Sequence, residues 1–86
     1  MKTKEIESFS EINIPGMGLF IPIIVVYRSP KDYPEKYVAR LWDLARPIEI
    51  ALTRDTLSEI RKEIPLGFVN LGRQENDDPV IVESWV

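Results

Sequence analysis

The run Ile23–Arg28, IIVVYR, constrains the fold more than any other part of this chain. Nearly every position is β-branched or aromatic, which is the composition of a β-strand. Both faces of such a strand are apolar, so both must be covered. We therefore expect this strand in the middle of a sheet or at an interface between subunits. Pro22 has no N–H to donate, so the paired part should begin just after it.

Two further segments, Lys36–Leu44 and Pro47–Thr53, predict the strands of a hairpin. In the second, Ile and Leu alternate with Glu and Ala, the period of a strand with one buried face. The connecting residues LARP contain no Asn-Gly or Asp-Gly pair, so neither the turn type nor the register follows from them. Val80–Val86 predicts a last strand, and Gly67–Gly72 predicts either a short strand or an extended connection.

One segment, Thr53–Pro65, has the spacing of an amphipathic helix. Three apolar residues fall on one helical face: Leu57, Ile60 and Ile64. Thr56 and Glu59 fit a capping box, in which a hydroxyl and a carboxylate satisfy backbone donors, and Asp55 is the competing N-cap. Pro65 then stops the helix.

The order strand, strand, strand, helix, then one or two strands predicts an α+β fold. We expect a small, mainly antiparallel sheet of four or five strands, with the helix packed on one face. Residues 19–86 are expected to form this single domain. Residues 1–18 are expected to be an N-terminal arm or a short docked helix, because three apolar residues recur at every third position before IPGMG ends regular structure. They are Ile6, Phe9 and Ile12.

Composition excludes several functions. The chain has no cysteine and no histidine, which removes disulfides, thiol chemistry and the usual zinc sites. With a formal net charge of −3 it lacks the basic surface of a nucleic-acid-binding protein. The longest apolar run, Leu19–Tyr27, is about half the length needed to span a bilayer. We expect a cytoplasmic protein with no cofactor, no membrane contact and no direct nucleic-acid binding.

Acidic residues provide the only candidates for catalysis or metal binding. Glu49 and Glu83 lie in predicted strands and could form the carboxylate pair of an acid–base enzyme, or lie on the solvent face or beside Arg40. The loop RQENDDP, with Asp77 and Asp78, lacks the alternating oxygen ligands and the glycine of a calcium loop. No G-x-S-x-G motif or phosphate loop occurs. We expect a protein that is not an enzyme and has no metal site.

Aromatic and basic residues provide candidates for protein binding, because tyrosine, tryptophan and arginine are favoured at interfaces. Most lie in the stretch YRSPKDYPEKYVARLWD, which otherwise reads as a turn between two strands. Both tryptophans have core packing as the alternative role. The candidates for partner binding are Tyr27, Arg28, Lys31, Tyr33, Tyr37, Trp42 and Trp85.

Together these patterns favour a small, non-enzymatic protein-interaction module. The alternative is an acidic inhibitor or regulator that occupies a basic, nucleic-acid-binding surface of another protein, and a carboxylate-dependent enzyme is third. One short helix covers only one side of the strand at Ile23–Arg28. The other side is expected to be covered by a second copy in a homodimer, or by the N-terminal segment folding back.

Overall fold

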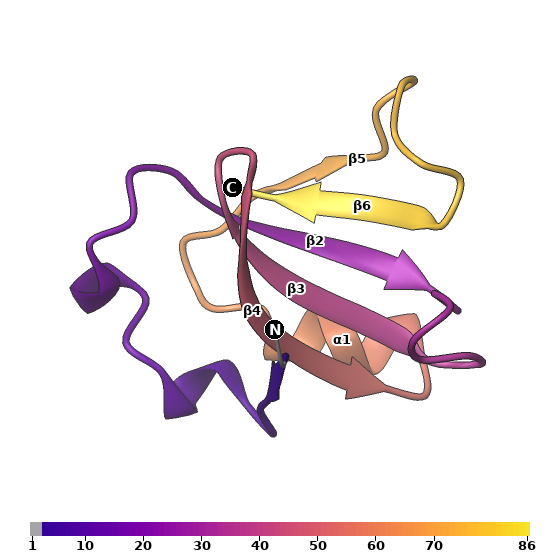
Figure 1. Cartoon of the computed structure of the whole chain (residues 1–86), viewed down its shortest axis with the longest axis horizontal. Helices are drawn as coiled ribbons and strands as arrows, with labels where there is room; N and C mark the ends of the chain where they lie inside the picture. The colour runs from indigo at the N-terminus through magenta and orange to yellow at the C-terminus, as the bar shows by residue number, and fades with distance from the viewer. Residues whose placement is uncertain (1–2) are drawn as a thin grey trace.

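The computed structural model describes residues 3–86, which form a six-stranded sheet with one α-helix (Figure 1). The strand order across the sheet is β1-β4-β3-β2-β6-β5. The elements follow along the chain as β1 (Lys4–Glu5), the short 3₁₀ helices η1 (Phe9–Glu11) and η2 (Pro15–Met17), β2 (Pro22–Arg28), β3 (Tyr37–Asp43), β4 (Arg46–Arg54), α1 (Leu57–Glu63), β5 (Asn70–Gly72) and β6 (Ile81–Trp85). No helix in this part of the chain is long and apolar enough to cross a membrane.

The expected α+β class with a single helix is confirmed, but the strand count and the pairing need correction. The sheet has six strands instead of four or five, and it is mixed, because β1 lies parallel to β4. The other pairings are antiparallel. β1 has only two residues, too few for an alternating pattern to be recognised in the sequence.

The sequence analysis placed Ile23–Arg28 either in the middle of a sheet or at an interface between subunits. In the structure β2 is a central strand. It pairs along its whole length with β3 and, on its other side, with β6. β6 is in turn paired with β5 through Ser84 and Trp85, so this end of the last strand does not lie at an edge. The edges of the sheet are the two shortest strands, β1 and β5, which limits the unpaired backbone that they expose.

The predicted hairpin is β3–β4, and its turn is Leu44 and Ala45. Leu44 has φ of 57°, in the left-handed region that glycine and asparagine usually occupy. The register of the two strands shifts between Arg40 and Trp42. Glu49 lies opposite this shift with φ of 41°, so the bulge bends β4 away from a flat sheet.

The predicted helix is confirmed as α1. Thr56 is its N-cap: the hydroxyl accepts the N–H of Glu59 and also donates to the Glu59 carboxylate. Asp55, the competing cap, instead forms an ion pair with Lys36. Ile60 is fully buried, and Leu57 and Ile64 pack against the same core.

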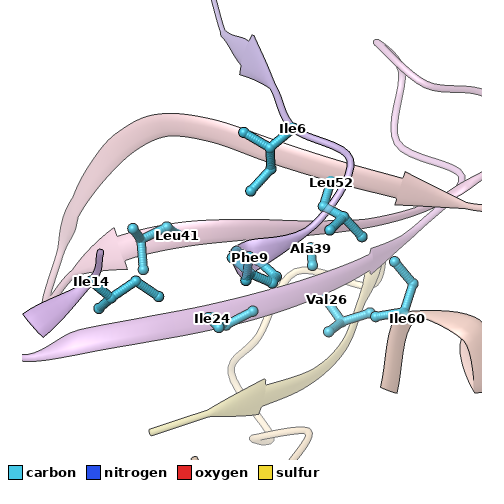
Figure 2. Close-up of a cluster of buried hydrophobic side chains, with 9 residues drawn as sticks. All are labelled: Ile6, Phe9, Ile14, Ile24, Val26, Ala39, Leu41, Leu52 and Ile60. Carbon is cyan, nitrogen blue, oxygen red and sulfur yellow. The ribbon is translucent and has the colours of Figure 1, made fainter. Parts of the chain in front are cut away.

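The core lies on the side of the sheet that faces α1 (Figure 2). Alternate residues of β2, β3 and β4 point into it, and the helix adds one side chain. The buried cluster consists of Ile6, Phe9, Ile14, Ile24, Val26, Ala39, Leu41, Leu52 and Ile60.

The N-terminal segment packs on this same side, so it shares the core with α1. Ile6, Phe9 and Ile14 are each 4–6% exposed and contact side chains from the sheet. Ser8 begins η1 with a capping box, in which its hydroxyl accepts a backbone N–H and the Glu11 carboxylate accepts the N–H of Ser8. The segment therefore consists of short turns, and it covers the face that the helix leaves open near the start of β2.

Candidate protein-interaction surface

The opposite face of the sheet is formed by the alternate residues of β2 and β3. Val25 lies beside Arg40, and Ile23 beside Trp42. These side chains point away from Ile24 and Val26 because successive residues of a strand point to opposite faces. Neither α1 nor the N-terminal core residues belong to this face.

The β2–β3 loop covers one end of this face. The Arg40 guanidinium lies 5.9 Å from the ring centre of Tyr27 and 5.7 Å from that of Tyr33, and it also pairs with Asp32 of the loop. Val38, on the same face, is fully buried. Burial raises the pKa of the Tyr27 hydroxyl. The arginine and both tyrosines therefore hold the loop against the sheet.

Trp42 lies at the next position of this face, towards the β3–β4 turn. The Trp42 indole offsets part of the rise in the Tyr27 pKa that burial causes. Yet among residues 3–86 no acceptor meets the geometry of a hydrogen bond to this N–H. Trp42 thus contributes chiefly a flat apolar surface.

Beyond Trp42 the face is open and forms a shallow trough of about 270 Å³. Its floor comes from β2, β3 and β6, and its rim from the β3–β4 turn and the β5–β6 hairpin. The lining residues are Ile23, Val25, Tyr27, Trp42, Leu44, Leu71, Asp77, Ile81, Ser84 and Val86.

The seven residues singled out in the sequence do not gather on one surface. Tyr27 and Trp42 line the trough, and Tyr33 lies over Arg40. Tyr37 and Trp85 pack against the core on the opposite side. The remaining two, Arg28 and Lys31, are exposed at the β2–β3 loop.

The two candidate catalytic glutamates lie far apart. β3 and β2 separate β4, with Glu49, from β6, with Glu83, which corresponds to about 14 Å at the usual strand spacing. Glu83 is 2% exposed and accepts two hydrogen bonds from Arg61 of α1, at 2.7 and 3.2 Å, and one from the Trp85 indole at 2.8 Å. Burial alone would raise the pKa of Glu83, but these hydrogen bonds outweigh it and hold the pKa below its usual value.

The aspartates of RQENDDP accept hydrogen bonds from backbone N–H groups of their own loop. The Asp77 carboxylate accepts the backbone N–H of Gln74 at 2.8 Å, and the Asp78 carboxylate accepts that of Val80 at 3.1 Å. In the described part of the chain, no three acidic side chains gather in the manner of a metal site.

A surface that the sequence analysis missed is the set of exposed apolar side chains at one end of the molecule. Large apolar residues with 37% to 103% exposure occur in the loop before β2, the β3–β4 turn, the α1–β5 connection, β5 and the end of β6. We call this set the apolar end. It consists of Met17, Phe20, Ile21, Leu44, Leu66, Val69, Leu71 and Val86.

Backbone hydrogen bonds hold the segments of the apolar end together. The N–H of Leu44 donates to the Ile21 carbonyl at 2.9 Å, and Val69 and Val86 exchange two hydrogen bonds at 2.7 and 3.0 Å. The loop before β2, the β3–β4 turn, the α1–β5 connection and the end of β6 lie together at the left of Figure 1, and the β2–β3 loop lies at the right. Apart from Leu71 of β5, the exposed apolar residues therefore belong to segments opposite the β2–β3 loop that the sequence favoured.

A groove lies between the N-terminal segment and the α1–β5 connection, beside the apolar end. It has a volume of about 400 Å³, and all but one of its lining side chains are apolar or proline. The residues are Phe9, Ile12, Asn13, Ile14, Pro15, Pro22, Pro65, Leu66 and Phe68. The polar one, Asn13, accepts the backbone N–H of Gly16 within its own turn.

One sequence signal marks the apolar end in retrospect. In a chain with 29% charged residues, neither Ile12–Tyr27 nor Ile64–Gly72 contains a charge. These two stretches supply most of the exposed apolar side chains.

Comparison with protein-family models, curated proteins and solved structures finds no significant match for the chain.

Proposed function

We propose that the protein is a non-enzymatic interaction module that binds another protein through its apolar end. One observation carries the proposal: eight large apolar side chains are exposed on adjoining segments at one end. Soluble monomers usually scatter such residues, and a contiguous apolar surface is typical of a binding site. The turn residues Leu44 and Ala45 carry no charge, and Arg46, the first residue of β4, is paired with Asp43 at 3.3 Å.

The non-enzymatic part of the proposal draws support from how the acidic residues are used. The Glu83 carboxylate accepts hydrogen bonds from Arg61 and Trp85. Glu49 lies on β4, which is not adjacent to β6, the strand of Glu83. Acidic residues elsewhere pair with Lys36, Arg40 and Arg54, which does not favour an inhibitor that presents an acidic face. We place the module in the cytoplasm because the chain uses no cysteine.

The test compares two variants with the same change of charge. Leu66 is fully exposed, so Leu66→Glu removes apolar surface from the apolar end without disturbing the core. Ser58→Glu places the same charge on exposed α1, whose first turn follows the end of β4. Each immobilised protein is exposed to an extract of the native host, and bound proteins are identified by mass spectrometry.

We expect a discrete protein to be retained by the wild type and by Ser58→Glu and to be lost with Leu66→Glu. Retention of the same proteins by all three would contradict the proposal, because binding would then not use the apolar end. Equal melting temperatures of the two variants verify that the loss reflects the surface and not the fold.

A further inference from the structure

Phe20 protrudes from the apolar end on a well-anchored loop. Its side chain is 92% exposed, although the adjacent Leu19 packs against the core. The N–H of Ile21 donates to the Asp43 carboxylate at 2.9 Å, and the Ile21 carbonyl accepts the N–H of Leu44 at 2.9 Å. An aromatic side chain held in place in this way loses little conformational entropy when it is buried by a partner.

The groove that could receive such a side chain lies on the same end of the same molecule. Pro22, two residues after Phe20, lines it, and so does the fully exposed Leu66. Its volume of about 400 Å³ is within the range of about 300–1,000 Å³ for binding clefts. One surface thus presents both a protruding aromatic residue and an apolar recess, which is what a symmetric, self-complementary interface requires.

The exposed area and the charges also suit a second copy. Five side chains of the apolar end do not line the trough: Met17, Phe20, Ile21, Leu66 and Val69. At about 150–200 Å² for a fully exposed large side chain, their exposed fractions amount to roughly 500–700 Å², to which the groove lining adds, against about 800 Å² per partner in a standard interface. The loop and the connection that carry Phe20 and Leu66 contain no charge. Two copies can therefore meet there without burying unpaired charges, although each has a net charge of −3.

We propose that the apolar end forms a symmetric homodimer in which Phe20 of each protomer inserts into the apolar groove of the other. This inference rests on the proposed function and names its partner as a second copy of the chain. A lipid surface is the less favoured occupant, because interfacial binding usually adds basic residues beside the apolar ones, and here the nearby Arg46 is paired with Asp43.

The first experiment is sedimentation equilibrium of the wild type, Phe20→Glu, Leu66→Glu and Ser58→Glu from low micromolar concentration upwards. We expect dimers for the wild type and Ser58→Glu. For Phe20→Glu and Leu66→Glu the dissociation constant of the dimer should rise by about 30-fold or more, as is typical when a central aromatic or apolar anchor is lost. Because Phe20 and Leu66 are exposed, neither change removes core packing.

The second experiment locates the contact with the aromatic side chain retained. A photoreactive p-benzoylphenylalanine replaces Phe20 in a mixture of ¹⁵N-labelled and unlabelled protein. We expect mixed-isotope dimers cross-linked to residues 12–15 or 65–68. Cross-links confined to the trough residues or to the β2–β3 loop would overturn the proposed geometry.

Three outcomes overturn the dimer and differ in what they leave standing. A monomeric wild type whose host partner is still lost with Leu66→Glu refutes the second copy and keeps the proposed function. A monomer that sediments with phosphatidylcholine vesicles, and no longer does so as Phe20→Glu, refutes the dimer in favour of a lipid surface. A monomer that does neither removes both proposals.

Discussion

Leu44 has a backbone conformation and an exposed side chain that do not stabilise the folded protein. Its φ of 57° is costly for a branched side chain, and 60% of that side chain is exposed. Asn tolerates this conformation, so Leu44→Asn should raise the free energy of unfolding by about 0.5–1 kcal/mol, or roughly 2–8 °C in Tm. The same change should weaken association through the apolar end.

Thermal unfolding in the Leu66→Glu background checks the stability effect, because association no longer contributes there. Sedimentation of the single variant checks the effect on association. A lower Tm for Leu44→Asn in that background would show that the Leu44 side chain stabilises the fold, and would contradict the expected relief of backbone strain.

Glu83 should make the stability depend on pH. Its pKa is lowered in the folded protein, so its contribution is fully present above the unfolded value of about 4.3 and is lost as the pH falls through the folded value. Glu83→Gln should cost about 1–3 kcal/mol at pH 7, since Arg61 and Trp85 lose a charged acceptor.

Urea unfolding of both proteins between neutral and acidic pH measures this effect. The difference between wild type and Glu83→Gln should shrink as the solution becomes acidic. Asp43 and Asp55 also have lowered pKa values, so the variant should retain part of the acid sensitivity. A difference that stays constant down to acidic pH would exclude the bond to Arg61 as its source.

At the scale of elements, the N-terminal segment contributes three side chains to the core, so its removal from the core should destabilise the fold. Phe9 is 4% exposed within the buried cluster, whereas Phe20 is 92% exposed. Phe9→Ala should therefore cost about 3–5 kcal/mol, and Phe20→Ala less than about 0.5 kcal/mol. Urea unfolding in the Leu66→Glu background compares the two, and equal stabilities would mean that the segment is a mobile arm after all.

The elements that local patterns specify were predictable from the sequence, and those fixed by distant contacts were not. α1 has both a helical face and an N-cap, and the β3–β4 hairpin has a strand period. β1 exists only because Lys4 and Glu5 meet the middle of β4, which no pattern within two residues can reveal. The 3₁₀ helix η1 does have a local signal, the capping box of Ser8 and Glu11, but the place on the sheet where Phe9 docks depends on distant contacts.

The candidate site was predictable only in part, for a reason that lies in the alternation of strands. Tyr37 and Trp42 are an odd number of positions apart on β3, so they must point to opposite faces. Which face the helix and the N-terminal segment would cover does not follow from the residues of β3. The exposure of Phe20 and Leu66 depends on how two loops are placed, and composition does not report it.

At the scale of the whole molecule, the covering elements are fewer than a sheet of this size needs. α1 and the N-terminal segment share one face, and the β2–β3 loop protects only part of the other. A chain of about this length buries only roughly 60–65% of its unfolded surface, so some apolar area is bound to remain outside. Here that area is collected at one end, where a partner can cover it.

The central position of β2 has a consequence for synthesis on the ribosome. β2 can pair with β3 as soon as the hairpin region has been made, but its other edge is filled by β6, the last strand of the sheet in the chain. At about 5–20 residues per second, the interval between Val26 and its partner Glu83 is roughly 3–11 s. During that time the most apolar strand of the nascent chain has one open edge, and a chaperone that binds extended apolar segments has its longest opportunity there.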